Sequence, residues 1–185
     1  DTTAGVAGAA EAGAELGLEV VPGIEVSSSF RDHEIHILGL FVDTDSPSLQ
    51  AALKEFRQHR DQRNQEMLGR FDAHGIHLTA EDLCAGNPDT VITRAHVARA
   101  LLAKGLGPDL DHIFKKYLQY GGIYCPPKEF LPPEAVMEAL LDSHAFVALA
   151  HPFQYKLGDK ATEELIAYLA GLGMKGLEVY HSSHN

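Results

Sequence analysis

Three residues with metal-binding side chains interrupt segments that are otherwise apolar. Glu25 lies within PGIEVS, His36 lies within EIHILGL, and His151 directly follows the run FVALA. A carboxylate and neutral imidazoles that converge form a common ligand set for divalent metal ions. Burying them without a metal ion or another partner would cost several kcal/mol each. The set indicates a metal site, but the residues alone leave the alternative of hydrogen-bonded core histidines and an exposed Glu25 open.

Two further histidines follow a short apolar segment near the end of the chain. His181 and His184 come directly after GLEVY, just as His151 comes after FVALA. In α/β folds with parallel strands, functional residues gather at the carboxyl ends of the strands. We therefore expect these three histidines at one edge of a sheet.

A second set of candidate residues is basic. Arg94 begins the segment TRAHVARALL, and Lys116 lies in IFKKYLQY. Arginine suits bidentate contact with phosphate, and lysine acts as a point charge. These side chains could hold a substrate phosphate, or they could simply be solvated on the faces of helices.

The elements that must position these residues alternate at the two ends of the chain. Residues 1–45 and 133–185 show β-α alternation, which is typical of a parallel sheet or barrel. Residues 46–132 show helical patterns with little strand signal, so we interpret them as a helical insertion. The first helix is expected to be capped by Thr2 or Thr3 and to end at Gly17.

Individual elements can be predicted within this organisation. LEVV and IEVS, separated by Pro22-Gly23, resemble short strands, and residues 34–42 resemble a strand that is buried on both faces. Ser46-Pro47 is a helix start, and the helix is expected to run to about His74. Shorter helices are expected at 80–85, 94–104 and 109–119. From residue 133 the pattern predicts helix, strand FVALA, helix and strand GLEVY.

Composition limits the class of protein. The chain has 185 residues, 45% hydrophobic residues and a formal net charge of −11. The apolar content suffices for a core, and the acidic balance argues against a surface that follows a DNA groove. Cys84 and Cys125 show no metal-binding spacing. No apolar run approaches the ~20 residues of a membrane span. We expect a soluble, cytoplasmic and monomeric protein.

In this order, the motifs PGIEVSS, HEIHILGLF, TRAHVARALL, IFKKYL, VALAHPFQY and GLEVYHSSHN resemble those of the PHP (polymerase and histidinol phosphatase) metal-dependent phosphoesterases. The strongest resemblance is to the nucleoside 3′,5′-bisphosphate phosphatases and 5′-3′ exoribonucleases. It covers essentially the whole chain. It implies an α/β fold, a distorted seven-stranded β/α barrel similar to a TIM barrel, with a helical insertion.

The resemblance also implies roles for individual residues. Glu25 matches a bridging carboxylate, and His36 and His151 match metal-binding imidazoles, so that Glu25 and His151 would act in catalysis. Two to three divalent ions are implied, manganese foremost, with zinc or iron as alternatives. The remaining family ligands would lie before Asp1 and after Asn185, so we expect a longer protein.

The implied substrate is a small phosphorylated molecule, a nucleoside 3′,5′-bisphosphate or a 5′-phosphorylated RNA end. Its phosphates would be bound by a set of four residues, Arg94, Lys116, Tyr155 and His184. Gln154 stands where nucleotide-processing relatives often have arginine, which is a departure from the pattern. The alternatives are a histidinol-phosphate-type or broad phosphomonoesterase, and a PHP module that has lost its chemistry.

Overall fold

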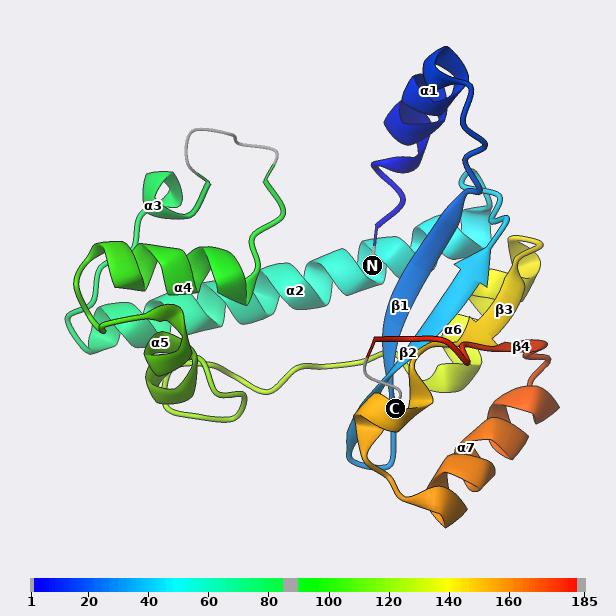
Figure 1. Cartoon of the computed structure of the whole chain (residues 1–185). Helices are drawn as coiled ribbons and strands as arrows, with labels where there is room; N and C mark the ends of the chain where they lie inside the picture. The colour runs from blue at the N-terminus through cyan, green and yellow to red at the C-terminus, as the bar shows by residue number, and fades with distance from the viewer. Residues whose placement is uncertain (1, 85–89, 183–185) are drawn as a thin grey trace. The chain divides into compact units, whose positions relative to one another are not determined.

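The computed structural model describes residues 2–84 and 90–182 (Figure 1). Its helices are α1 (Val6–Leu16), α2 (Pro47–Ala73), α3 (Ala80–Cys84), α4 (Arg94–Ala103), α5 (Leu110–Tyr117), α6 (Pro133–Asp142) and α7 (Asp159–Gly171), with a 3₁₀ helix, η1 (Pro152–Tyr155). Its strands are β1 (Gly23–Phe30), β2 (His33–Leu40), β3 (Phe146–Leu149) and β4 (Gly176–Leu177).

The chain divides into two compact units. The α/β unit comprises Asp1–Phe56 and Phe130–Asn185, and the helical unit comprises Arg57–Glu129. The α/β unit contains all four strands of the described sheet. The helical unit contains α3, α4, α5 and the part of α2 that follows Phe56.

The sheet of the α/β unit is mixed, in the order β1-β2-β3-β4. β1 and β2 form an antiparallel hairpin, β2 pairs antiparallel with β3, and only β3 and β4 are parallel. The alternation of strands and helices is typical of a parallel sheet or barrel, but among the described strands the pairings of β1 with β2 and of β2 with β3 are antiparallel. The connection between Phe30 and His33 is too short for anything but a hairpin, because a parallel crossover needs a dozen or more residues.

One face of this sheet is buried, and the other carries polar side chains. In β2, Ile35, Ile37 and Gly39 are buried, whereas Glu34 and His36 between them are only partly covered. The prediction of a strand buried on both faces was wrong, because buried and partly covered residues alternate along β2, as expected when successive strand side chains point to opposite faces.

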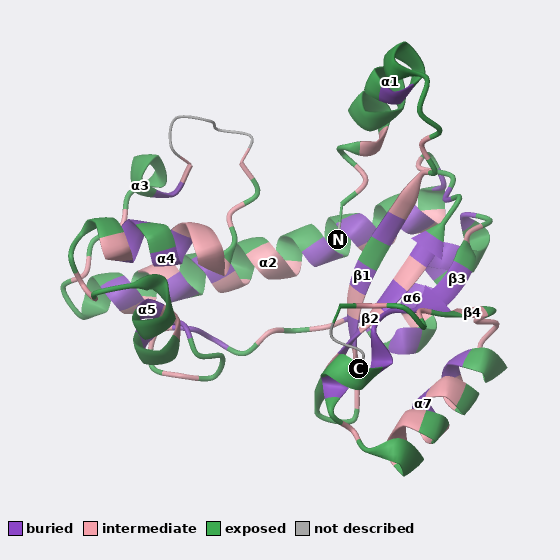
Figure 2. Cartoon of the chain, viewed as in Figure 1, coloured by how far each residue is buried: buried purple, intermediate pink, exposed green. Residues whose placement is uncertain are grey.

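The core of the α/β unit forms between the buried face of the sheet and its helices, where Figure 2 shows buried residues along β3 and α6. Its members are apolar residues of low exposure: Val26, Ile35, Ile37, Val136, Leu140, Val147, Leu149, Leu165 and Leu169. Ser28 is also buried, and its hydroxyl donates a hydrogen bond of 2.7 Å to the carbonyl of Leu131. A satisfied hydroxyl avoids the cost of burying an unpaired donor.

The helical unit has its own core, made of Met67, Phe71, Val97, Leu101, Ile113 and Leu118. Local sequence signals position its helices. Thr93 caps α4, with its backbone N–H donating to His96 Nδ1 at 3.1 Å. Asp109 caps α5 by accepting a bond of 2.8 Å from the His112 N–H. These caps satisfy amide groups that have no partner within the helix.

Several predicted elements differ from the observed ones, mostly at their ends. The segment Leu18 to Val21 is not a strand, and both of these side chains are exposed. Strand propensity alone does not form a strand without a neighbour to pair with. The first helix begins at Val6 with Gly5 as its N-cap, not with Thr2 or Thr3, and it ends at Gly17 as predicted.

Elements with strong local signals are found close to where they were expected. The long helix begins at Pro47 and ends at Ala73. The strand predicted in GLEVY is reduced to Gly176–Leu177, because only these residues pair with β3. Among the residues that the structure describes, no helix is both long and apolar enough to cross a membrane.

Candidate metal centre

Glu25 and His36 lie on the polar face of the β1–β2 hairpin. Glu25 is paired with Leu38, and His36 is paired with Ser27, so the two functional residues are diagonal neighbours. Diagonal neighbours on one face are within reach of long side chains. The alternation of β1 and β2 therefore brings the carboxylate to the imidazole.

His151 reaches the same place from the end of β3. The N–H of Ala150 donates to the carbonyl of His36 at 3.0 Å, which continues the pairing of β2 with β3 by one residue. His151 then leaves the strand with φ 23° and ψ 59°. This positive φ is unusual for a residue with a side chain. Its N–H donates to Glu178 Oε2 at 2.7 Å, which holds the turn.

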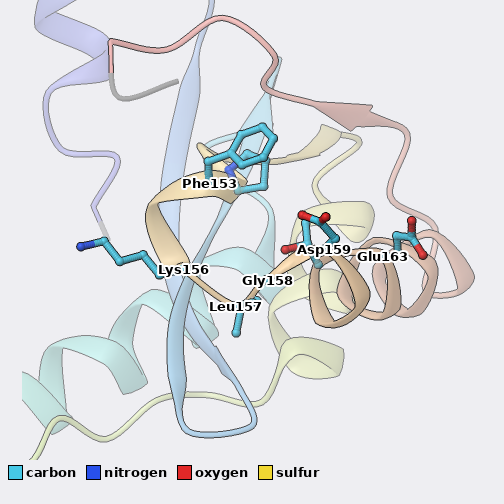
Figure 3. Close-up of a pocket in the computed structure, with 8 residues that line it drawn as sticks. Phe153, Lys156, Leu157, Gly158, Asp159 and Glu163 are labelled. Atoms are coloured by element: carbon cyan, nitrogen blue, oxygen red, sulfur yellow. The ribbon is translucent and has the colours of Figure 1, made fainter. Parts of the chain in front are cut away.

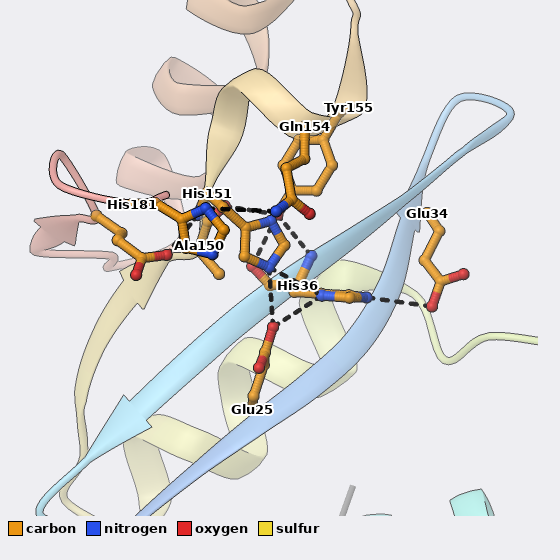
Figure 4. A network of polar contacts seen from close by, with 9 residues as sticks. Glu25, Glu34, His36, Ala150, His151, Gln154, Tyr155 and His181 are labelled. Carbon is orange, nitrogen blue, oxygen red and sulfur yellow. Dashed lines mark hydrogen bonds and ion pairs between the residues drawn. The ribbon is translucent and has the colours of Figure 1, made fainter. Parts of the chain in front are cut away.

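Three donor atoms converge at this point (Figure 4). Glu25 Oε1 lies 2.7 Å from His36 Nδ1 and 3.0 Å from His151 Nε2. The two ring nitrogens are 3.2 Å apart. The structure thus brings together all three residues that were predicted to bind metal.

The electrostatics of the cluster favour charged and hydrogen-bonded forms. Burial alone would raise the pKa of Glu25, but the hydrogen bond from His151 and the charge of His36 lower it below its usual value. The hydrogen bond to the Glu34 carboxylate raises the pKa of His36. Burial opposes this effect, and the charge of Glu25 adds to it.

Glu34 and Tyr155 surround the three donors and orient them. Glu34 Oε1 lies 3.2 Å from His36 Nε2, on the edge of the ring away from Nδ1, where the carboxylate can accept a hydrogen bond from Nε2 and fix the orientation of the ring. The Tyr155 hydroxyl accepts a bond of 2.9 Å from the His36 N–H and donates one of 2.7 Å to the Ala150 carbonyl. One side chain therefore joins the backbone of β2 to the residue before His151.

The donor set fits a divalent metal ion. Neighbouring ligands on an octahedral ion with bonds of about 2.1 Å lie about 3.0 Å apart, close to the separations found here. His151 is 8% exposed, and its Nδ1 is buried without a hydrogen-bond partner among the described residues. The imidazole is therefore not fully satisfied as a core residue would be, since only its Nε2 has a polar partner, Glu25. The half-exposed Glu25 keeps the cluster open to solvent.

Two surface pockets lie near the turn that carries His151. One, of about 410 Å³, is lined by His36, His151 and residues beside them, including Glu34, Gln154 and Tyr155. The other, of about 250 Å³, lies on Phe153, Lys156 and the start of α7 (Figure 3), and none of the three cluster residues lines it. Of these two pockets, only the first is lined by residues of the metal-ligand cluster, His36 and His151.

The residues predicted to bind substrate lie in different parts of the molecule. Tyr155 borders the metal-site pocket, but its hydroxyl is engaged by the backbone, and burial above all raises its pKa. Arg94 and Lys116 belong to the helical unit. Arg94 Nη1 donates to the Leu118 carbonyl at 2.9 Å, and Lys116 lies 4.8 Å from the Tyr117 ring. His184 lies outside the described residues.

Sequence reasoning missed two carboxylates. Glu34 could have been found, because it precedes His36 by two residues and therefore shares its face. Glu178 gave no such signal, since its contact with His151 depends on the pairing of β4 with β3. His181, which the sequence placed at a strand end, has its ring centroid 5.2 Å from that of His151.

No model of a protein family matches the chain, but it is similar to proteins that are named as phosphatases and exoribonucleases. It is 33% identical to a 3′,5′-nucleoside bisphosphate phosphatase of Chromobacterium violaceum, over 100% of this chain and 65% of the relative. It is 34% identical to the 5′-3′ exoribonuclease Rnm of Escherichia coli, over 92% of this chain and 59% of the relative. The chain thus spans less than two thirds of the length of these relatives.

Solved structures give the same result. An amidohydrolase from Chromobacterium violaceum, described with bound sulfate and no metal, superposes with a TM-score of 0.86 at 33% identity, covering 99% of this chain and 65% of that one. A protein from Bifidobacterium adolescentis, assigned as a metal-dependent phosphoesterase, gives 0.84 at 26% identity, covering 100% and 65%. These similarities confirm the resemblance seen in the motifs: the chain is similar to a nucleoside bisphosphate phosphatase, to a 5′-3′ exoribonuclease and to a metal-dependent phosphoesterase.

Proposed function

We propose that this chain carries the metal-binding part of a hydrolase that cleaves a phosphate ester of a nucleotide. The substrate is a nucleoside 3′,5′-bisphosphate or a 5′-phosphorylated RNA end, as in the names of its relatives. The observation that carries this proposal is the convergence of Glu25, His36 and His151 on one point. Phosphoesterases use such carboxylate and imidazole sets to hold metal ions.

Glu25, His36 and His151 would hold two to three divalent ions, together with ligands from the rest of the protein. We propose manganese, because mixed oxygen and imidazole donors suit it, while zinc and iron are also compatible with these ligands. When bound, such ions activate a water molecule for attack and stabilise the charge of the phosphate. Glu25, which matches the bridging carboxylate of the family that the motifs resemble, would be shared by two of them.

Other residues of the chain would bind the substrate or position the metal ligands. Glu34 keeps the Nδ1 lone pair of His36 toward the ions, and Tyr155 holds the ligand-bearing strands in register rather than contacting substrate directly. Arg94 and Lys116 would neutralise substrate phosphate, and His184 would contact phosphate or protonate the leaving oxygen. Guanidinium groups are well suited to this task, because they offer two parallel donors to a phosphate.

The complete protein would form a distorted seven-stranded β/α barrel, of which residues 1–45 and 133–185 supply a part. Residues 46–132 would be an insertion that selects the substrate. The structural similarity to the Chromobacterium protein over 99% of this chain and 65% of that one supports the proposal that the chain is part of a larger fold.

A cyclic phosphodiester is the second candidate substrate. The chain is 29% identical to a phosphoribosyl 1,2-cyclic phosphate 1,2-diphosphodiesterase of Eggerthella lenta, over 100% of this chain and 70% of the relative. A histidinol-phosphate-type or broad phosphomonoesterase and a module without activity are the further alternatives. Hydrolysis of adenosine 3′,5′-bisphosphate, a cyclic phosphate and an aryl phosphate by the full-length protein separates these substrates.

The decisive variant is Glu25→Gln in the full-length protein. We expect it to bind fewer manganese ions per chain, measured by elemental analysis after desalting, and to lose turnover of adenosine 3′,5′-bisphosphate. Glu19→Gln, which alters an exposed carboxylate outside the sheet, should keep both properties. Wild-type stoichiometry and turnover in Glu25→Gln would show that the ligand assignment is wrong.

A further inference from the structure

The short helix η1 separates the metal-site pocket from a second pocket. Gln154 and Tyr155 line the metal-site pocket. Pro152 and Phe153, on the same turn, line the pocket of about 250 Å³ (Figure 3), which we call the η1–α7 pocket. η1 begins directly after His151, and both pockets belong to the α/β unit. The η1–α7 pocket is therefore joined to a candidate metal ligand by a single turn of chain.

Phe153 presents an aromatic ring at the surface of the η1–α7 pocket. It is 67% exposed, whereas Pro152 and Tyr155 on the same turn are buried. A single exposed apolar residue is common in proteins, but this one borders a cavity beside candidate metal ligands. Nucleobases of every type stack on such rings, because each base has a flat π-face. The ring therefore offers a binding surface for a base.

Lys156 ends η1 in a backbone conformation that favours other residue types. Its φ is 54°, in the left-handed region, which glycine and asparagine occupy more readily than lysine does. The backbone alone therefore gives no reason for a lysine here, and such outliers cluster at functional sites. Figure 3 shows the side chain extending away from Asp159 and Glu163. The ammonium group is thus placed to act as a point charge on a phosphate at the rim of the pocket.

The side of the pocket that α7 forms is acidic. Asp159, Thr162 and Glu163, on the first turns of α7, line it. Carboxylates repel a phosphate group, but they accept hydrogen bonds from the amino groups of bases. The volume of about 250 Å³ is below the roughly 300–1,000 Å³ of sites for drug-sized ligands, so the pocket suits one ring system and not a whole nucleotide. Charge and size both favour a base over a phosphate.

We propose that the η1–α7 pocket binds the base of the second nucleotide of a 5′-phosphorylated RNA. This base stacks on Phe153 and donates hydrogen bonds to Asp159 or Glu163, while Lys156 contacts the RNA backbone beside it. The metal-site pocket, of about 410 Å³, takes the first nucleotide, so the pocket across η1 takes the next one. The inference deepens the proposed function and rests on it for the identity of the substrate. It makes Phe153 a residue that selects RNA over mononucleotides.

Binding to metal-free protein tests this site separately from catalysis. Full-length protein treated with a chelator would be titrated calorimetrically with the 5′-phosphorylated dinucleotide pApA, with the same dinucleotide lacking its second base, and with adenosine 3′,5′-bisphosphate. We expect wild type to bind pApA about 5-fold or more tightly than the abasic form, because the second base stacks. Phe153→Ala should abolish this preference, and its affinity for the bisphosphate should change by no more than about twofold.

Two further aromatic variants serve as controls. Phe41→Ala removes a phenyl ring that is 60% exposed and follows the end of β2 opposite His33, so the preference for the second base should remain. Phe153→Trp keeps a flat ring and should keep the preference, which guards against loss of fold as the cause of the alanine result. Equal affinity of wild type for pApA and its abasic form, or equal preferences in Phe153→Ala and Phe41→Ala, would overturn the proposal.

The charge of Lys156 should act on both dinucleotides alike. Lys156→Asn removes the charge, and asparagine tolerates the left-handed backbone. We expect pApA and its abasic form each to bind about two- to fivefold less tightly, because a backbone contact does not depend on the base. Lys160→Asn, which alters an exposed lysine that does not line the pocket, is the matched control. Equal affinities in the two lysine variants would contradict the role of Lys156.

Failure of this inference and failure of the proposed function give different results. Hydrolysis of an aryl phosphate by the manganese-loaded wild type tests the proposed function on its own, because that substrate has no second base. A protein without hydrolysis whose preference for the second base depends on Phe153 would contradict the catalytic proposal and leave the base site in place. An active enzyme in which Phe153→Ala weakens pApA and the bisphosphate equally would overturn the assignment of the pocket to the second base.

Discussion

The α/β unit and the helical unit hold their functional groups in different ways. In the α/β unit, the three candidate ligands come from strand positions far apart in sequence, and backbone pairing between strands sets their separation. In the helical unit, Arg63 of α2 and Arg94 of α4 both make cation–π contacts with the ring of Tyr120. The sheet fixes the positions of its side chains rigidly enough for metal ligands. The arginine side chains of the helical unit can vary more in position.

This difference has a physical reason. Metal ligands must meet within a few tenths of an ångström, which a hydrogen-bonded sheet provides because its backbone positions are fixed by pairs of bonds. Binding of a phosphate group tolerates looser geometry, since long arginine side chains adjust and charge attraction falls slowly with distance. We therefore expect substitutions in the sheet to affect metal binding and those in the helices to affect selectivity.

The largest effect is expected for His151→Asn. Asparagine tolerates the positive φ of this position, so the fold should survive while one ligand is lost. Turnover should fall by orders of magnitude, with a melting temperature near that of wild type. The pair of measurements is kcat and the thermal midpoint. A lowered midpoint with intact kcat would mean that His151 is a core residue.

A smaller effect, confined to selectivity, is expected for Arg94→Ala. Loss of one charged hydrogen-bonded contact costs about 1.5–3 kcal/mol, which is roughly 10- to 150-fold in affinity. KM for adenosine 3′,5′-bisphosphate should rise far more than KM for an aryl phosphate. Arg99→Ala, on the same helix, is the control. Equal rises for both substrates would argue that Arg94 only supports the helical unit.

Glu34→Gln should weaken manganese binding without removing a ligand. The amide keeps the size of the side chain but not the charge that orients His36, and such outer partners are typically worth about 10- to 100-fold in affinity. We expect a loss of manganese affinity at the lower end of this range, measured by manganese titration followed by electron paramagnetic resonance. Asp32→Asn removes a charge from the same pocket without contacting His36. If both variants bind equally well, Glu34 has no orienting role.

The smallest effect is expected for Tyr155→Phe, and it concerns stability. The change removes a donor to Ala150 and leaves the His36 N–H without its acceptor. An unsatisfied buried group costs about 1–3 kcal/mol in the free energy of unfolding, measured by urea denaturation. Tyr180→Phe, at a side chain that is 95% exposed, should change it by less than about 0.5 kcal/mol. If Tyr155→Phe and Tyr180→Phe changed the free energy of unfolding equally, the hydrogen bonds of the Tyr155 hydroxyl would not stabilise the fold.

Much of the local structure was predictable from sequence. Ser46-Pro47 correctly predicted the start of α2, and Gly17 correctly predicted the end of α1. The directions of the strands were not predictable from composition: the pattern was typical of a parallel sheet or barrel, whereas β2 pairs antiparallel with both β1 and β3. The assignment of residues 46–132 to an insertion stays a prediction, as does each substrate-binding role.

The sequence by itself determined which chemistry the chain could carry. A glutamate and two histidines within apolar segments were sufficient to indicate metal binding, because burying such groups is costly without a partner. Only the tertiary structure decided how they meet. Strand pairing sets Glu25 diagonal to His36, and the turn after β3 brings His151 from 126 residues away in the chain to within 3.0 Å of Glu25. Contacts between residues so far apart depend on the packing of the whole unit, which no local pattern of residues specifies.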